Sequence, residues 1–439
     1  MIRGLVSGLV KTTSGGSGTG FDTSLRPLKG AALQNREDSD FRTNATLREF
    51  YFRVPYIIVG DQFTLAPQIN NWFKAGSGDS SITTDTTYSE MSLEHPNGTI
   101  KPITIGGVRS RTLSAGEGDV VYDDMAASNF GVGVFADGIT VWIKGKGSVP
   151  AATNLVATAA YYGDLTGSQC SWYDSAATTV SSTDTAGVFT YTGTAPTVFT
   201  SGVHVMPKLL GRAVSVNTKA IGGVGDSITD ATGDVITQGA FGRGYFFKSM
   251  RSAANVPLNP GFSMARGGVT ISAFTNGNKW VANLKYVDAL LVCVGTNDFN
   301  SAITLATFQS RFTAFLDQLN TYGFDETTIV VAELAQITYS ANAYIDEAGQ
   351  TVGQLADPLL GPRWDVGGVV EQANDWMESL VGTRIKSFSR FPATKGVVNP
   401  KKWFADGVDA HKATGDGIHP NSVGGEMRAV VMRPVIAAL

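Results

Sequence analysis

The pattern of apolar residues changes near residue 214, and this change constrains the fold more than any other feature of the sequence. Beyond that point, short apolar runs alternate with segments that carry apolar residues at helical spacing. The clearest stripe, over 303–320, comprises Leu305, Phe308, Phe312, Phe315, Leu316 and Leu319. Strands that alternate with helices form βαβ units, in which a mostly parallel sheet carries helices on both faces. The second half of the chain is therefore predicted to be an α/β domain.

The same patterns place the individual elements of this half. They predict strands over 218–224, 287–294, 328–332 and 386–391, and helices over 241–254, 303–320, 366–380 and 421–439. Cys293 lies within an apolar run, so it is predicted to be a buried strand residue rather than a redox centre. The other cysteine, Cys170, lies far away in the sequence, and the two form no zinc pattern or disulfide framework.

The first half of the chain shows no helical period. From 45 to 213, short β-type runs such as 50–59 and 139–143 are separated by turn clusters, which favours an all-β accessory domain of the sandwich or jelly-roll kind. Residues 1–44 are polar and rich in Gly, Ser and Thr, and they are predicted to form an extended arm that only a partner or a neighbouring subunit would order. The predicted regions are thus 1–44, 45–213 and 214–439.

Composition and charge exclude several classes of protein. The 34 Lys and Arg against 38 Asp and Glu give a formal net charge of −4, with no basic footprint for nucleic acid. No apolar stretch is long enough for a transmembrane helix, and the first ten residues make a poor signal peptide. The low charged fraction of 16% and the 51 glycines favour an extracellular or virion-associated protein. The arm favours a homo-oligomer, a trimer if the protein is built like a phage tail protein.

Four histidines, His95, His204, His411 and His419, are the candidates for a base that works near neutral pH. Asp416 stands three residues before His419, in the loop that precedes the last predicted helix. A carboxylate at that spacing can fold back onto one imidazole nitrogen and leave the other free to face a hydroxyl. The alternative is a surface loop in which the aspartate caps the helix.

The candidate nucleophile is Ser227, in the segment 223–229 directly after a predicted strand. In open parallel sheets, ligands gather at the carboxyl ends of the strands. The same Gly-Asp-Ser triplet at 78–80 is predicted to be a chance occurrence in a polar loop. A rival nucleophile is Ser263, because 261–265 approaches the Gly-x-Ser-x-Gly motif of α/β-hydrolases, although Ala stands at its last position.

Two further segments could stabilise an oxyanion. Asn297 follows the strongest apolar strand, where its amide can act as a donor, although Gly-Thr-Asn-Asp at 295–298 can equally be a turn. Between the serine and the asparagine, the glycines of 265–270 would let a backbone N–H approach a reacting oxygen closely. Either Gly268 or Gly267 could supply that donor.

Taken in order, these segments resemble the four blocks of the SGNH hydrolases, also called the GDSL family, over 214–439. The matching blocks are Gly225–Ser227, Gly268, Gly295–Asp298 and Asp416–Pro420. Ile228 stands where the family often has Leu, and the second block is loose because Gly267 could take the place of Gly268. The resemblance implies a flavodoxin-like three-layer α/β/α domain.

The resemblance also implies a mechanism. Ser227 would attack an ester carbonyl, His419 would take and return its proton, and Asp416 would orient the imidazole. The backbone N–H groups of Ser227 and Gly268 and the side-chain amide of Asn297 would form the oxyanion hole. The reaction would pass through an acyl-enzyme, with no metal and no organic cofactor.

The expected substrate is a short-chain ester, most simply an acetyl group on a carbohydrate or polysaccharide. The β domain resembles accessory modules of carbohydrate-active enzymes, and no long apolar segment could form a lid over lipid chains. Several aromatic residues could stack on sugars or instead form the core of the sandwich: Trp72, Trp142, Trp172, Tyr161 and Tyr162. The alternatives are a lipase or thioesterase of the same family and a catalytically silent structural protein such as a virion adhesin.

Overall fold

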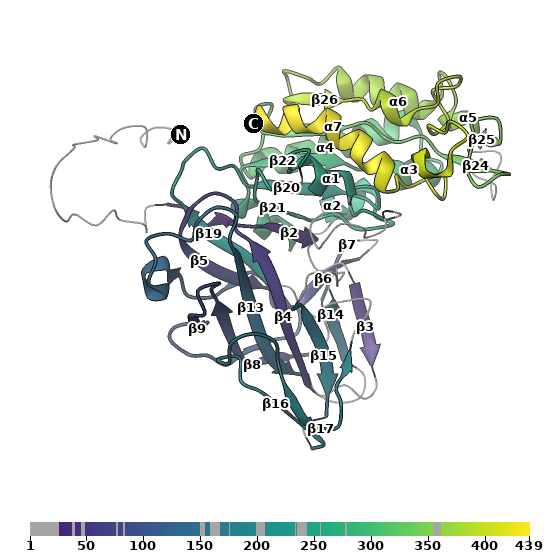
Figure 1. Cartoon of the computed structure of the whole chain (residues 1–439). Coiled ribbons are helices and arrows are strands. Elements are labelled where there is room, and N and C mark those ends of the chain that lie inside the picture. Colours follow the sequence, from purple (N-terminus) through teal and green to yellow (C-terminus); the bar gives the residue numbers. More distant parts are fainter. Residues whose placement is uncertain are drawn as a thin grey trace, which may run out of the picture.

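The computed structural model places a β domain beside an α/β domain (Figure 1). It describes residues 26–36, 40–44, 49–75, 78–81, 84–149, 154–158, 167–174, 176–198, 207–232, 234, 244–254, 256–276, 279–353 and 361–439.

Two antiparallel sheets form the β domain. One contains β1 (Lys29–Gly30), β19 (Lys208–Ala213), β5 (Gln62–Ile69), β11 (Val120–Val121) and β12 (Met125–Ala126). The other contains β10 (Arg111–Leu113), β8 (Thr86–Glu94), β13 (Thr140–Ser148), β4 (Glu49–Ile57), β15 (Gln169–Tyr173), β18 (Thr197–Val198) and β9 (Ile100–Pro102). Phe52 and Ile143 from the second sheet share one buried core with Leu65 and Leu209 from the first. The prediction of an all-β sandwich is confirmed.

Shorter elements complete this domain. They are the pairs β3 (Asp40–Asn44) with β14 (Asn154–Thr158), β6 (Trp72–Ala75) with β7 (Gly78–Ser81), and β16 (Thr178–Val180) with β17 (Tyr191–Gly193), together with the 3-10 turn η2 (Ala127–Phe130). Strand β7 contains the Gly-Asp-Ser triplet at 78–80. That triplet was expected in a loop, but it pairs with β6 in a hairpin.

The α/β domain is built on a six-stranded sheet whose strands all run parallel. Their order is β2 (Leu33–Arg36), β21 (Gly261–Ser263), β20 (Ile221–Gly225), β22 (Ala289–Cys293), β23 (Ile329–Ala332) and β26 (Ser387–Ser389). Side chains along a strand point alternately to the two faces. In β22, Leu290 and Val292 join one core, while Leu291 and Cys293 join the core of the opposite face. The buried position predicted for Cys293 is confirmed.

Helices cover both faces, which confirms the three-layer α/β/α prediction (Figure 1). One face packs against α2 (Ile271–Asn276), the 3-10 helix η3 (Trp280–Tyr286), α4 (Leu305–Thr321) and α6 (Val369–Glu378). The other packs against α1 (Gly244–Ser249) and α7 (Ser422–Ala437). The remaining elements are α3 (Thr296–Asn300), α5 (Gly361–Trp364), the hairpin of β24 (Thr338–Ser340) and β25 (Gln350–Val352), and the 3-10 turns η5 (Pro392–Thr394) and η6 (Asp409–His411).

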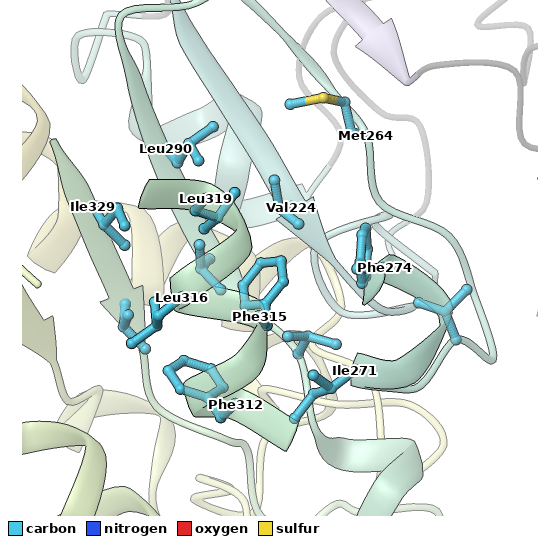
Figure 2. Packing of buried hydrophobic residues seen from close by; sticks show 14 of the residues in the cluster. Val224, Met264, Ile271, Phe274, Leu290, Phe312, Phe315, Leu316, Leu319 and Ile329 are labelled. Atoms are coloured by element: carbon cyan, nitrogen blue, oxygen red, sulfur yellow. The ribbon is translucent and has the colours of Figure 1, made fainter. Parts of the chain in front are cut away.

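In helix α4, the apolar stripe predicted from the sequence packs against the parallel sheet. Its buried side chains include Phe312, Phe315 and Leu319, which lie against the sheet residues Val224 and Leu290 in one cluster (Figure 2). The helix begins after Thr304, whose hydroxyl accepts a hydrogen bond from the N–H of Thr307 at 3.2 Å and so satisfies one free donor of the first turn. The Phe308 ring of α4 lies 2.7 Å from a carbon added at Gly295, so the start of this helix packs beside the carboxyl end of β22.

The segment predicted as an arm is not separate from the two domains. Lys29–Gly30 pairs with β19 in the β domain, and Leu33–Arg36 pairs with β21 as the edge strand of the parallel sheet. The expectation that only a partner would order the arm is therefore wrong for this part, because two sheets of the same chain offer it free strand edges. Residues 1–25 lie outside the described residues.

The two domains also share a core. Trp72 and Leu210 of the β domain are buried in the same cluster as Trp280 and Leu284 of the α/β domain. Polar contacts border this interface: the amide of Gln68 donates to Asn283 Oδ1 at 3.3 Å, and the Lys279 ammonium donates to the carbonyl of Gly116 at 2.9 Å. The β domain is thus packed onto the α/β domain along an apolar interface.

Candidate active site

Ser227 lies in a tight turn just beyond the carboxyl end of β20. Gly225 closes the strand, and a side chain there would collide with the carbonyl oxygen of Cys293, 2.3 Å from the added carbon. The carboxylate of Asp226 then accepts hydrogen bonds from the N–H of Ile228 at 3.1 Å and from the N–H of Thr296 at 3.3 Å. These bonds hold the serine turn against the start of α3.

The structure brings Ser227, His419 and Asp416 together. His419 Nε2 lies 2.8 Å from Ser227 Oγ, and His419 Nδ1 lies 2.7 Å from Asp416 Oδ2. The other carboxylate oxygen of Asp416 accepts hydrogen bonds from the N–H groups of His419 at 2.8 Å and Ile418 at 2.9 Å. The carboxylate thus favours the tautomer with a proton on Nδ1, which leaves Nε2 to accept the serine proton.

The environment of Asp416 keeps it ionised. Partial burial alone would raise the pKa of this carboxyl, but the hydrogen bonds from the His419 ring and from two backbone N–H groups lower it to about 2. A negative charge beside Nδ1 stabilises an imidazolium when Nε2 gains a proton.

Neighbouring elements fix the loop that carries this pair. The carbonyl of Gly417 accepts hydrogen bonds from the N–H of Thr338 in β24 at 2.9 Å and from the indole N–H of Trp403 at 2.8 Å. Gly417 has a φ of +79°, and a side chain there would lie 1.9 Å from the carbonyl oxygen of Thr338. Only glycine fits this position, so the hairpin of β24 and β25 can press directly on the loop.

The structure distinguishes the two candidate glycines. The N–H of Gly267 donates to Asp230 Oδ2 at 3.0 Å, so it is engaged. Gly268 is exposed with a φ of +79°, and its N–H makes no hydrogen bond to any residue that the structure describes. The N–H of Ser227 is unpaired within the same set of residues. Gly268 is therefore the better placed of the two to donate to a ligand.

Asn297 extends from the first turn of α3. Its side-chain amide donates one hydrogen bond to the carbonyl of Val269 at 2.9 Å, which leaves the second amide hydrogen for another acceptor. The candidate donors of Ser227, Gly268 and Asn297 thus come from three separate segments that follow the carboxyl ends of neighbouring strands.

Asp226 is a fully buried carboxyl directly beside the serine. Burial raises its pKa from 3.8 to about 6, although the N–H groups of Ile228 and Thr296 oppose the shift. Sequence reasoning treated this residue only as part of a motif. Its role in joining two loops depends on contacts across strands, and no local pattern signals them.

The other histidines do not reach this site. His95 is buried between the rings of Phe130 and Phe135, and its Nδ1 accepts a hydrogen bond from the N–H of Asn97. His411 pairs with Asp406 at 2.9 Å on the exposed side of the loop. His204 lies outside the described residues.

The rival nucleophile is not accessible. Ser263 is fully buried in β21, and its hydroxyl accepts a hydrogen bond from the N–H of Ala265 at 3.2 Å. Among the residues described, no group of three or more His, Cys, Asp or Glu could hold a metal ion. The helices in the same part of the chain include none with the length and apolar character of a membrane span.

Of the aromatic residues considered for sugar stacking, two can be described. Trp72 is buried in the interdomain core. The ring of Trp142 is half-buried, and the Arg53 guanidinium lies 3.6 Å from its centre and covers one face. Tyr161, Tyr162 and the side chain of Trp172 lie outside the described residues. Neither described ring therefore offers two open faces.

Comparison with known proteins points to one family. Residues 224–427 match the model of the GDSL-like Lipase/Acylhydrolase family. The search of curated proteins finds no match. Similar solved structures include a member of the lipolytic protein G-D-S-L family from Veillonella parvula, with 16% identity over 50% of this chain and 99% of that one and a TM-score of 0.33.

Two further structures are similar over most of the chain. A carbohydrate esterase family 2 enzyme plus carbohydrate binding domain from Corynascus thermopiles is 12% identical over 94% of this chain and 98% of that one, with a TM-score of 0.33. A family two carbohydrate esterase from Cellvibrio japonicus is 10% identical over 93% of each chain, with a TM-score of 0.32. The family match contains the serine turn, the loop of Gly268, the segment of Asn297 and the Asp416–His419 loop, so the second half of this chain carries a GDSL-like lipase/acylhydrolase domain.

Proposed function

We propose that the protein is a serine esterase that hydrolyses carboxylic esters through an acyl-enzyme. The observation that carries this proposal is the hydrogen-bonded chain from Ser227 Oγ through the His419 ring to Asp416. A serine hydroxyl is a weak nucleophile unless an adjacent base removes its proton, and this arrangement supplies the base and the group that orients it.

In the first half of the reaction, Ser227 Oγ attacks the ester carbonyl carbon and its proton passes to His419 Nε2. The tetrahedral intermediate then collapses, and the leaving alcohol takes the proton from Nε2. In the second half, water attacks the acyl-enzyme, gives one proton to Nε2 and forms the carboxylic acid as Nε2 returns that proton to Ser227. Asp416 stays ionised throughout and stabilises the imidazolium.

The developing oxyanion would be held by the N–H groups of Ser227 and Gly268 and by the amide of Asn297. Support for this set comes from the N–H groups of Ser227 and Gly268, which have no partner among the described residues, and from the second amide hydrogen of Asn297. Each such donor typically contributes about 3 kcal/mol to lowering the barrier.

We further propose that the acyl group is short, in the first place acetyl, and that the alcohol belongs to a carbohydrate. Polar groups lie beside the nucleophile: a carbon added at Gly267 would lie 3.7 Å from both Ser227 Cβ and Asp230 Oδ2 and 3.8 Å from Thr232 Oγ1. Polar groups at this position suit a small acyl group and a hydroxylated leaving group better than an alkyl chain. The low charged fraction and the Gly-rich composition support an extracellular or virion-associated location.

The alternatives make different predictions. A lipase or thioesterase of the family would prefer acyl chains of eight carbons or more, whereas the proposed enzyme would prefer acetyl. A silent structural protein would release no acetate at all. Acetate release from a panel of acetylated polysaccharides, beside a series of aryl esters of increasing acyl length, separates the three.

The decisive variant is Ser227→Ala. We expect it to lower turnover of an aryl acetate by about 10⁴-fold or more while the melting temperature stays close to that of the wild type. Ser263→Ala is the matched control, because it removes a hydroxyl from a neighbouring strand of the same sheet and should keep its activity. Turnover that survives in Ser227→Ala would exclude this nucleophile.

A further inference from the structure

Two consecutive side chains in the first turn of α3, just after β22, hold the segment that follows Gly268. The amide of Asn297 donates to the carbonyl of Val269 at 2.9 Å, and Asp298 Oδ2 accepts a hydrogen bond from the N–H of Ile271 at 2.9 Å. The side chains of Val269 and Ile271 are themselves fully buried. The residues just after Gly268 are therefore fixed in place from within the domain.

Gly268 itself has no such support. It is exposed, and a carbon added at its Cα would meet no atom of the described residues within 4 Å. Its N–H direction is therefore set through the chain on either side: by the bond from the Gly267 N–H to Asp230 before it, and by the bonds to Val269 and Ile271 after it. A backbone donor stabilises an oxyanion only within about 2.7–3.1 Å, and a displacement of about 1 Å can lower a rate by about 10²-fold.

Asp298 is a charged group with no access to solvent. Its side chain is 0% exposed, and its second oxygen accepts a hydrogen bond from Arg311 Nη1 in α4 at 2.8 Å. Burial raises the pKa of Asp298, and the Ile271 N–H and the Arg311 cation oppose that shift. A buried carboxylate is tolerated when its oxygens are paired in this way. Arg311, Asp298 and Ile271 thus connect helix α4 to the loop.

We propose that Asp298 and Arg311 are positioning residues that aim the Gly268 N–H at the oxyanion. This role rests on the proposed esterase activity. Neither side chain needs to touch the substrate: Arg311 orients the carboxylate from the rigid helix α4, and the carboxylate sets the position of Ile271 three residues after the donor. Because the donor matters most when charge develops on the carbonyl oxygen, losing its support affects kcat more than KM.

The test compares variants at both positions with an aryl acetate as the substrate. In Asp298→Asn, the new NH₂ group faces either the Ile271 N–H or the Arg311 guanidinium and cannot accept its hydrogen bond. We expect kcat to fall by about 10–100-fold, while KM stays within about threefold of the wild-type value. Arg311→Met should lower kcat by about tenfold. Arg311→Lys should keep most of the wild-type kcat, because its ammonium can donate the single hydrogen bond that Arg311 makes to Asp298. The Arg311 pair serves as the test if Asp298→Asn does not fold.

A matched control lies at the other end of β22. Asp288 also accepts a backbone hydrogen bond, from the N–H of Ala220 at 2.9 Å, and pairs with a cation, Lys29, at 3.2 Å. Asp288→Asn should therefore lower the melting temperature without changing kcat. Affinity for phenylboronic acid, which forms a tetrahedral adduct on a catalytic serine, should weaken in parallel with kcat in Asp298→Asn and stay unchanged in Asp288→Asn.

The outcomes separate this inference from the proposed function. If the wild type is active and Ser227-dependent, but Asp298→Asn loses only stability or raises only KM, the positioning role is wrong and the esterase assignment stands. An equal fall of kcat in Asp288→Asn would also overturn it, because general loosening would then explain the effect. If the wild type shows no Ser227-dependent turnover, both proposals are overturned.

Discussion

Asp226 should make the protein less stable as the pH rises through the acidic range. Its carboxyl is fully buried, and its pKa is raised to about 6 in the folded state from 3.8. Below about pH 3.8 the group is protonated in both the folded and the unfolded states and contributes nothing. Between these values only the unfolded state releases the proton, so the free energy of unfolding falls with pH. The pKa shift corresponds to a loss of about 3 kcal/mol in the free energy of unfolding. This loss is nearly complete near pH 6 and stays constant above it.

The variant Asp226→Asn isolates this contribution, because it cannot ionise. We expect the free energy of unfolding of the wild type minus that of the variant to fall by about 3 kcal/mol between pH 3.5 and 6.5, measured by urea unfolding followed by tryptophan fluorescence. Asp416→Asn, measured down to about pH 2, is a control of opposite sign, since the pKa of Asp416 is lowered from 3.8 to about 2 and its contribution is lost as the pH falls through that range. A difference curve for Asp226→Asn that is flat or rises with pH would refute the reasoning.

Two further predictions concern stability. Removing residues 1–36 should lower the melting temperature more than removing residues 1–25, because only the longer deletion takes β1 from β19 and β2 from the edge of β21. Equal melting temperatures would contradict a stabilising role for these two strands. Arg428→Met should raise the melting temperature in scanning calorimetry. The Arg428 guanidinium is fully buried, lies 4.5 Å from the centre of the Phe391 ring, and has no hydrogen-bond partner among the residues described. A lower melting temperature would show that the ring contacts outweigh the cost of burying the charge.

Much of the α/β domain could be predicted because each element has its own local pattern. The stripe of phenylalanines around Phe312 predicted a helix over 303–320, and α4 spans Leu305–Thr321. The helix predicted over 241–254 is shorter in the structure. Helix α1 ends at Ser249, and the chain then turns back so that the Ser252 hydroxyl accepts a hydrogen bond from the N–H of Val256. Helical spacing in the sequence does not register such a local competitor.

Strand β2 could not be predicted, since its four residues, Leu-Gln-Asn-Arg, carry no apolar alternation. Its place depends on a free edge supplied by β21, far along the chain. The same limit applied to the site. The order of the motifs predicted that Ser227 and His419 meet. It could not distinguish Gly267 from Gly268, because that difference depends on the hydrogen bond from the Gly267 N–H to the Asp230 carboxylate. The roles of Asp226 and Asp298 likewise depend on contacts between loops.

The parallel pairing of Leu33–Arg36 with Gly261–Ser263 has a consequence for how the chain is made. Strand β2 leaves the ribosome before all strands of the β domain except β1, and its partner β21 emerges only after that domain. Closing so long a loop is slow, and until it closes the edge of β21 is open to any extended segment. Refolding at high concentration should therefore exchange this strand between molecules, while dilution should favour the monomeric pairing.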